Sequence, residues 1–219
     1  MPKNSLLSVF AHPVMTLNAF RALLALWVGR SGYLKNTAWW KSQLAMRPID
    51  VNGNPIPWIT YPSIRFLEPK LRSDMAVFEF GSGSSTLWWA KRVRRVVACE
   101  HDREWFERVR PQVQSNVELI HADRKDDAYS RQVLNYEREF DIVVIDGRDR
   151  VKCASNSLQA LKADGVIVWD NSDRDHYRRG FELLAQHGFR RVDFTGLTPL
   201  VVFECSTAIF YRDRNCLGL

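Results

Sequence analysis

Cysteine is scarce in this sequence, and the few cysteines form no pattern typical of a known site. The chain has four, Cys99, Cys153, Cys205 and Cys216, with no Cys-x-x-Cys pair and no spacing to the five histidines that suits a metal centre. Zinc-binding modules and disulfide-stabilised secreted domains are therefore disfavoured. Reduced thiols are the simplest state for these residues, and we expect a cytoplasmic protein.

The sequence also lacks an uninterrupted hydrophobic segment of membrane-spanning length. Its most apolar stretch, residues 14–28, contains Asn18 and Arg21 and falls short of the about 20 residues that cross a bilayer. No small-residue cleavage site follows it, which disfavours a signal peptide. We expect a helix that packs on the protein or on a second copy in a homo-oligomer. Peripheral contact with a membrane through residues 14–28 is the alternative.

Internal repeats and low-complexity tracts are absent as well, which favours one main folded unit. A chain of 219 residues that is 46% hydrophobic can bury the core of one α/β domain. Glycine and proline cluster in residues 51–62 and predict a hinge. We therefore expect residues 1–60 to form a helical extension and hinge, and residues 61–219 the main domain. The net charge of +6 suits an acidic substrate, a nucleic acid or an anionic membrane and selects none of them.

What the sequence does contain is a glycine turn between two apolar runs. Residues 77–86 read Val-Phe-Glu-Phe-Gly-Ser-Gly-Ser-Ser-Thr, and a second apolar run ends at Glu100. The pattern predicts strand, turn, helix and strand, with Ser84 as the N-cap of the helix. Glycine lets a ligand approach the backbone closely, and a carboxylate at the second strand tip can accept hydrogen bonds from a ribose diol. We therefore expect an adenosine-containing cofactor.

The identity of that cofactor depends on the residue three positions after the second glycine. A nicotinamide-binding fingerprint carries a third glycine there, where the helix packs closely on the strand. This chain has Thr86 instead. A nicotinamide-dependent oxidoreductase is therefore the less favoured alternative.

Beyond Glu100, apolar runs continue to alternate with polar-faced segments. We expect strands at residues 76–80, 95–100, 117–121, 140–146, 166–169, 189–194 and 207–211. Helices are expected at 63–71, 84–92, 103–114, 151–161 and 176–187, with another inside 125–138. The last two strands have no helical crossover between them and can be antiparallel neighbours. The pattern predicts a Rossmann-like, doubly wound α/β domain with a mostly parallel sheet.

The ordered acids at the strand ends resemble those of class I S-adenosylmethionine-dependent methyltransferases. Their first motif, acid-x-Gly-x-Gly, is similar to Glu79-Phe-Gly81-Ser-Gly83, and the resemblance covers roughly residues 60–212. It implies seven strands, the last one antiparallel, and S-adenosylmethionine as the cofactor. It also implies these cofactor-binding positions: Glu79 at the methionine end, Gly81, Gly83 and Ser84 in the turn, Glu100 at the ribose, Asp123 at the adenine, Asp146 after the fourth strand, and Tyr61 ahead of the first.

Oxygen-bearing side chains also end the fourth and fifth expected strands. Asp146 follows one strand and Asp170-Asn171 the next, and adjacent parallel strands lie about 5 Å apart. Two carboxylates and an amide suit Mg²⁺, and they are similar to the metal ligands of divalent-metal-dependent O-methyltransferases. In the alternative interpretation, Asp146 bonds backbone amides and Asp170-Asn171 forms a turn.

The general base is left open by this pattern. The metal-dependent enzymes of catechol type carry a lysine three residues after the first aspartate, where this chain has Asp149. Asp149, Asp173 and His176 are the candidates, and histidine is the commonest base because its pKa lies near neutrality. We take Asp149 and His176 as the candidate catalytic residues. Arg148 and Arg150 could grip an acidic group of the substrate or cap a surface loop.

These observations predict a methyltransferase, most directly one that methylates an oxygen of a small molecule or glycan intermediate. An RNA methyltransferase, or a non-catalytic cofactor- or RNA-binding module of the same fold, is the alternative. The sequence has no evident stacking platform of aromatic and basic residues for nucleic acid, which disfavours that alternative.

Overall fold

The computed structural model describes residues 13–28 and 32–219. The helices are α1 (Pro13–Val28), α2 (Tyr33–Asn36), α3 (Trp39–Ala45), α4 (Tyr61–Leu67), α5 (Ser84–Ala90), α6 (Arg103–Val109), α7 (Ala128–Arg131), α8 (Arg150–Ala160) and α9 (Arg178–Gln186). The strands are β1 (Ala76–Phe80), β2 (Arg95–Glu100), β3 (Val117–His121), β4 (Phe140–Ile145), β5 (Leu161–Asp170), β6 (Arg190–Gly196) and β7 (Cys205–Tyr211).

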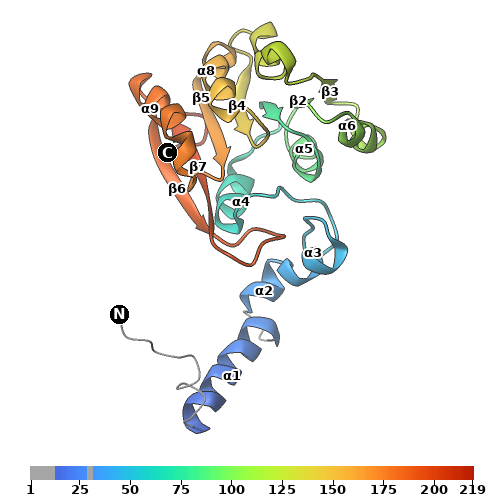
Figure 1. Ribbon diagram of the computed structural model, residues 1–219, viewed down its shortest axis with the longest axis vertical. Coiled ribbons are helices and arrows are strands. Elements are labelled where there is room, and N and C mark those ends of the chain that lie inside the picture. Colours follow the sequence, from blue (N-terminus) through green and yellow to red (C-terminus); the bar gives the residue numbers. More distant parts are fainter. Residues whose placement is uncertain (1–12, 29–31) are drawn as a thin grey trace.

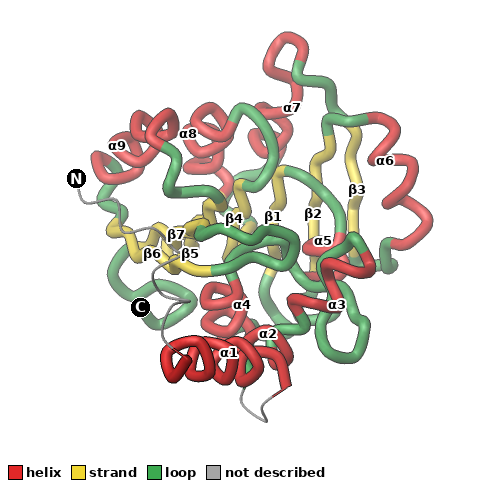
Figure 2. Tube along the Cα trace, turned by 60° about the horizontal axis from the view of Figure 1, so that its bottom comes forward, coloured by secondary structure: helices red, strands yellow, loops and turns green. Residues whose placement is uncertain are grey.

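All seven strands form one sheet in the order β3-β2-β1-β4-β5-β7-β6 (Figures 1 and 2). The strands β1 to β5 pair in parallel, and β7 pairs antiparallel with both β5 and β6. The expected Rossmann-like fold with an antiparallel last strand is confirmed. Chain order reverses at β1, where β2 leads to one side and β4 to the other, and ligands of such sheets bind at the carboxyl ends beside this switch point.

The sheet is buried on both faces, because successive side chains of a strand point to opposite sides. On one face Phe78, Phe80 and the neighbouring strands pack against α7, α8 and α9. On the other face Val77 and Val144 pack against α4 and α5, where Trp88 and Trp89 are fully buried. The aromatic helix residues Trp88 and Trp89 are therefore part of the core.

Strand β5 begins earlier than the strand expected at residues 166–169. Strand β5 runs without interruption from Leu161 to Asp170, and its pairing with β4 shifts register between Phe140 and Ile142. Asp141 lies at this shift, and its carboxylate accepts a hydrogen bond from the Ala76 backbone N–H at 2.8 Å and pairs with Lys162 at 2.9 Å. The irregular pairing between Leu161 and Val166 accommodates Gly165 within the strand.

Ahead of the sheet, the chain forms the helices α1, α2 and α3, and α3 contacts the loop that joins the last two strands. The indole Nε1 of Trp39 donates to the carbonyl of Val201 at 3.0 Å, and Gln43 Nε2 donates to that of Pro199 at 3.3 Å. Both carbonyls belong to residues 197–204, which link β6 to β7 and are called here the β6–β7 loop. Helix α1 projects away from the domain (Figure 1).

Candidate cofactor and acceptor site

The glycine turn between β1 and α5 adopts a backbone conformation that side chains disfavour. Gly81 has a φ of 109° and Gly83 a φ of 148°, a region that only glycine enters without strain. The N-cap of α5 is Gly83 rather than Ser84. The backbone N–H of Gly83 donates to Thr86 Oγ1 at 2.9 Å. The hydrogen bond at the start of the helix therefore comes from the Thr86 hydroxyl, not from a Ser84 side chain.

Glu79 lies at the end of β1, directly beneath this turn. Its side chain is buried, and Oε2 accepts a hydrogen bond of 2.5 Å from Thr86 Oγ1. The other oxygen, Oε1, has no hydrogen-bond partner among the described residues. Burial raises the pKa of the Glu79 carboxyl to about 7. A buried acid with an unpaired oxygen is suited to a cationic ligand group, which would supply the missing partner and favour the ionised form.

Glu100 ends β2 beside the same turn, and its carboxylate is held in one orientation. Oε1 accepts hydrogen bonds from the backbone N–H groups of His101 and Asp102 at 2.8 and 2.9 Å. Oε2 accepts one from Ser82 Oγ at 3.0 Å. The side chain is buried, and His101 Nδ1 lies 2.9 Å from Oε1. A fixed carboxylate with one oxygen bound only to a rotatable hydroxyl can exchange that hydroxyl for those of a ribose.

Trp105 closes the outer side of the turn. Its Nε1 donates to the carbonyl of Ser82 at 2.8 Å, and a Cβ at Gly83 would lie 3.5 Å from its ring. The ring is positioned because Asp102 caps α6, accepting a 2.9 Å hydrogen bond from the Trp105 backbone N–H. The sequence pattern alone does not single out Trp105 as a site residue. Its position in the first turn after a strand-end acid is the signal that could have identified it.

Two further predicted cofactor positions lie at unequal depth. Asp123 is exposed at the end of β3, on the same edge as Glu100, and Ala122 N donates to the Glu100 carbonyl at 2.9 Å. Tyr61 is buried, with its ring edge-on to Tyr33 at 6.3 Å. Its hydroxyl is buried without a hydrogen-bond partner among the described residues, and burial raises the pKa of Tyr61 to about 12. Asp123 is free to meet a ligand, whereas Tyr61 packs the extension onto the domain.

The tips of β4 and β5 are joined by the guanidinium of Arg150. The side chain is buried and donates to the backbone carbonyls of Gly147, at 2.9 Å, and of Asp170. Its Nη2 also lies 3.2 Å from Asp146 Oδ1. Asp149, with a φ of 49°, turns the chain so that Arg150 begins α8 and points back at the strand tips. Arg150 therefore neither binds an acidic group of the substrate nor caps a surface loop, the two roles that the sequence had suggested.

The guanidinium of Arg150 is therefore a counter-charge for both Asp146 and Asp170. Burial, followed by the charge of Asp170, raises the pKa of Asp146 well above its usual value, while Arg150 opposes the rise. Burial also raises the pKa of Asp170, whose Oδ1 accepts a 2.7 Å hydrogen bond from Thr207 Oγ1. A quarter of the Asp146 side chain is exposed, whereas Asp170 is only 3% exposed. Asp146 is thus the one of the pair that faces a ligand.

These residues do not fit the predicted Mg²⁺ site. The guanidinium of Arg150 already supplies a cation between Asp146 and Asp170, and the Asp170 carboxylate is turned to Thr207. Asn171 follows with a φ of 53°, as in the turn of the alternative interpretation. Within residues 13–28 and 32–219, no cluster of three or more carboxylate, histidine or cysteine side chains is placed to hold a metal ion. The structure therefore gives the magnesium prediction no support.

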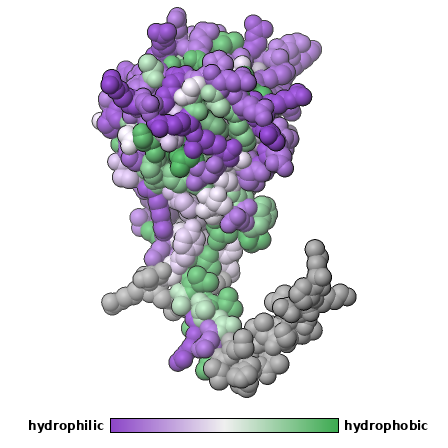
Figure 3. Space-filling view, turned by 90° about the vertical axis from the view of Figure 1, so that its left-hand side faces the viewer, coloured by the Kyte–Doolittle hydropathy of each residue, from purple (hydrophilic) through white to green (hydrophobic). Residues whose placement is uncertain are grey.

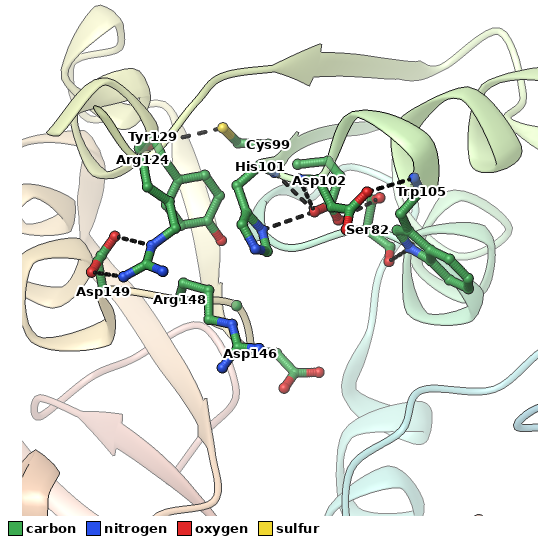
Figure 4. Close-up of polar contacts among 12 residues, drawn as sticks. Ser82, Cys99, His101, Asp102, Trp105, Arg124, Tyr129, Asp146, Arg148 and Asp149 are labelled. Atoms are coloured by element: carbon green, nitrogen blue, oxygen red, sulfur yellow. Dashed lines mark hydrogen bonds and ion pairs between the residues drawn. The ribbon is translucent and has the colours of Figure 1, made fainter. Parts of the chain in front are cut away.

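The candidate bases are placed differently from one another. Asp149 forms a two-point ion pair with Arg124, at 2.8 and 2.9 Å, and Arg124 lowers its pKa (Figure 4). Asp173 Oδ1 accepts a hydrogen bond from the Ser206 backbone N–H at 3.0 Å. His176 is exposed, with its ring 4.1 Å from that of Tyr177. Asp149 and His176 thus remain predictions, and the geometry makes Asp149 a weak base.

Figure 4 shows how these parts surround one space at the carboxyl edge. The Arg124–Asp149 pair stands on one side, and Ser82 with Trp105 on the other, while His101 and Arg148 project between them. The pieces are a backbone turn open to a ligand, an acid with an unpaired oxygen, an oriented carboxylate and a strand-tip acid of raised pKa. Such an arrangement can hold an adenosine group bearing a cationic amino acid tail, and it fits S-adenosylmethionine.

Comparisons with known proteins agree with this geometry. Residues 78–172 match a family model described as a methyltransferase domain. Among curated proteins, none matches the chain. The matched residues run from β1 to the end of β5, so they include the glycine turn and both strand-tip aspartates.

Solved structures share the fold at low identity. A methyltransferase from Geobacter sulfurreducens is 18% identical with a TM-score of 0.53, over 89% of this chain and 96% of that one. An rRNA methylase from Streptococcus thermophilus is 16% identical with a TM-score of 0.53, over 71% and 99%. A precorrin 8w decarboxylase from Methanobacterium thermoautotrophicum is 20% identical with a TM-score of 0.54, over 72% and 92%. The three named activities differ, so the acceptor has to be argued from the site.

Proposed function

We propose that this chain is a class I S-adenosylmethionine-dependent methyltransferase that methylates a hydroxyl oxygen of a small molecule or glycan intermediate, since residues 78–172 match a methyltransferase-domain model and the fold is shared with a solved methyltransferase. The observation that carries the proposal is the pair of acids at the glycine turn. Glu79 offers an unpaired buried oxygen, and Glu100 offers an oriented carboxylate. Glu79 would bind the cationic amino group of the cofactor and Glu100 its ribose hydroxyls.

Asp146 is the proposed general base. S-adenosylmethionine, when bound, supplies an electrophilic methyl group and a neutral thioether leaving group, so no acid is needed on the leaving side. The raised pKa of Asp146 brings a carboxylate closer to the proton affinity that suits a base at neutral pH. Arg150 keeps that carboxylate positioned after it accepts the acceptor's hydroxyl proton, through contacts to its Oδ1 and to its backbone carbonyl.

Charge distribution favours a small acceptor over RNA. Residues 61–219 contain 25 Lys and Arg against 24 Asp and Glu, a net charge of +1. Proteins that bind nucleic acid through phosphates present a basic stripe on the binding domain. An RNA acceptor is the second candidate, and it would be supported by salt-dependent RNA binding of the purified chain.

Calorimetric titration with S-adenosylmethionine tests the cofactor assignment. Glu100→Ala is expected to weaken binding by roughly 1.5–3 kcal/mol, the value of a lost hydrogen bond to a charged group. Glu104→Ala is the matched control, because the Glu104 side chain is 88% exposed in the first turn of α6. Equal affinities for the wild type and Glu100→Ala would remove Glu100 from the site, and no binding by the wild type would remove the proposed function.

A further inference from the structure

Among the described residues, seven of the thirteen exposed large apolar side chains lie on α1 and at the tip of the β6–β7 loop, and Leu44 and Met46 lie nearby at α3. Helix α1 presents five large apolar side chains that are each 43–60% exposed, Leu17, Phe20, Leu23, Leu24 and Leu26. The loop presents Val202 and Phe203, which are 75% and 63% exposed. Figure 3 shows apolar residues along the narrow part of the molecule below the hydrophilic domain. We call these two groups of side chains the apolar face.

Helix α1 has the proportions of a helix that lies on a membrane rather than one that crosses it. Its five large apolar side chains spread over about half of the helix circumference, with Asn18 opposite the middle of that half and Arg21 at its edge beside Leu17. Sixteen residues make a helix about 24 Å long, shorter than the roughly 30 Å of bilayer hydrocarbon. No helix in the described ranges is long and apolar enough to span a membrane. A helix of this kind buries its apolar side at the level of the lipid headgroups.

The charge of the chain is concentrated in the same region. Residues 1–60 contain six Lys and Arg and a single acid, Asp50, so they carry +5 of the net charge of +6. Arg21 on α1, Lys35 on α2, and Lys41 and Arg47 around α3 are all exposed. Basic side chains next to an anionic bilayer each strengthen binding roughly fivefold. A second copy of this chain would instead bring two basic extensions together, which like-charge repulsion opposes.

The apolar face lies on the same side of the molecule as the cofactor site. Strand β6 runs parallel to β5, because both pair antiparallel with β7. The β6–β7 loop therefore begins at the carboxyl edge of the sheet, where the glycine turn and Asp146 lie. The extension is bonded to this loop through Trp39 and Gln43, and Tyr61 N donates to Leu197 O at 2.9 Å. Helix α1 lies beyond this same end of the sheet (Figure 1), so a surface that met α1 and the loop would lie on the side that carries the site.

We propose that α1 and the β6–β7 loop dock the enzyme on an anionic bilayer, and that the methyl acceptor is an amphiphile anchored in that bilayer with its hydroxyl at headgroup level. The acceptor part of this inference rests on the proposed function, whereas the docking part does not. Docking would hold the acceptor near the carboxyl edge at a high local concentration. The site would then need no deep pocket for the acceptor's apolar part.

Vesicle co-sedimentation of the full chain tests the docking. We expect binding to vesicles of phosphatidylcholine mixed with phosphatidylglycerol, and much weaker binding to phosphatidylcholine alone. Leu24→Glu and, separately, Phe203→Ser should weaken that binding about tenfold or more. Both side chains are exposed, so the affinity for S-adenosylmethionine should stay unchanged, which shows that each variant is folded.

A charge-matched pair of variants separates docking from net charge. Arg47→Glu, in the extension, should weaken binding to the anionic vesicles, whereas Arg179→Glu, exposed on α9, should not. Equal loss in both variants would overturn the inference, because binding would then follow net charge alone. A wild type that stays in the supernatant with either vesicle type would also overturn it. If that protein is also a dimer in sedimentation velocity and Leu24→Glu makes it monomeric, the apolar face is a contact between copies.

The acceptor is tested by following the methyl group of radiolabelled S-adenosylmethionine. Vesicles made from the lipid extract of the cells that produce the protein are compared with the aqueous extract of the same cells. Label in the lipid phase that is lost with Leu24→Glu supports a membrane-anchored acceptor. Label only in the aqueous phase overturns that part. Vesicle binding by a chain that fails to bind S-adenosylmethionine would refute the proposed function and leave the docking intact.

Discussion

Replacing Glu79 by glutamine should make the ligand-free protein more stable and its cofactor site weaker. Burial raises the pKa of Glu79 from 4.5 to about 7, and a shift of this size corresponds to about 3 kcal/mol of difference between its two protonation states. Glutamine is neutral and similar in shape, so it avoids the cost of burying the charge. Its amide oxygen can still accept the hydrogen bond from Thr86 Oγ1.

The pH dependence identifies the cause. Below about pH 4.5 Glu79 is protonated in both the folded and the unfolded chain, and it contributes no pH dependence. As the pH rises toward 7, the unfolded chain loses this proton first, so the folded state loses stability relative to it. The free-energy advantage of Glu79→Gln over the wild type should therefore grow by about 1 kcal/mol near pH 5.5 and by about 3 kcal/mol above pH 7.

Urea unfolding of the two proteins at about pH 5 and about pH 8 measures this difference. Glu104→Gln, at a site that is 88% exposed, is the control and should show no growing advantage. Calorimetry should show weaker binding of S-adenosylmethionine by Glu79→Gln, since the neutral amide cannot pair with an ammonium group. An advantage that stays constant with pH would refute the burial argument, because it would mean that Glu79 keeps an ordinary pKa in the folded chain.

Three further substitutions test the rest of the site. Arg150→Met should lower the free energy of unfolding in urea by about 3–5 kcal/mol, because it leaves Asp146 and Asp170 without their shared counter-charge. A loss below about 1 kcal/mol would show that the strand tips do not depend on Arg150. Asp146→Asn should lower kcat by about 10²-fold or more, and an unchanged kcat would exclude Asp146 as the base. In a pH-rate profile, wild-type activity should fall as the pH drops through the raised pKa of Asp146. Trp105→Phe removes the Nε1 hydrogen bond to the glycine turn, so titration should show S-adenosylmethionine binding weaker by about 1 kcal/mol, and unchanged affinity would mean that the turn holds its shape alone.

The strands of the domain were predictable because burial on both faces of a sheet requires short, continuous apolar runs in the sequence. Runs such as residues 142–145 are apolar throughout and short, and each is followed by an acid or a glycine. The limits of β5 were wrong because irregular pairing can accommodate a glycine within a strand, and such pairing has no distinct sequence pattern. The N-cap was misplaced by one residue because Thr86 reaches back to the Gly83 backbone, a contact that cap preferences alone do not reveal.

The residues of the candidate site were predictable only where the position of a residue at the end of a strand is enough to assign its role. Glu79 and Glu100 follow from their strands. The part played by Arg150 does not, because it depends on a left-handed turn at Asp149 that aims the first residue of α8 backward. The ion pair of Asp149 joins it to Arg124, 25 residues earlier in the chain. Contacts of this kind arise from packing between loops and leave no trace in local spacing.

The hydrogen bonds around Thr60 determine where this chain can be cut. The Thr60 backbone N–H donates to Thr207 Oγ1 at 3.1 Å, and that hydroxyl donates to Asp170 at 2.7 Å. Thr60 Oγ1 also donates to the carbonyl of Phe194 at 2.9 Å. A fragment starting at residue 61 would therefore lose a link that ends at a strand-tip carboxylate. A shortened protein for crystallisation or screening should begin between α1 and α2, where removing the apolar helix leaves that link intact.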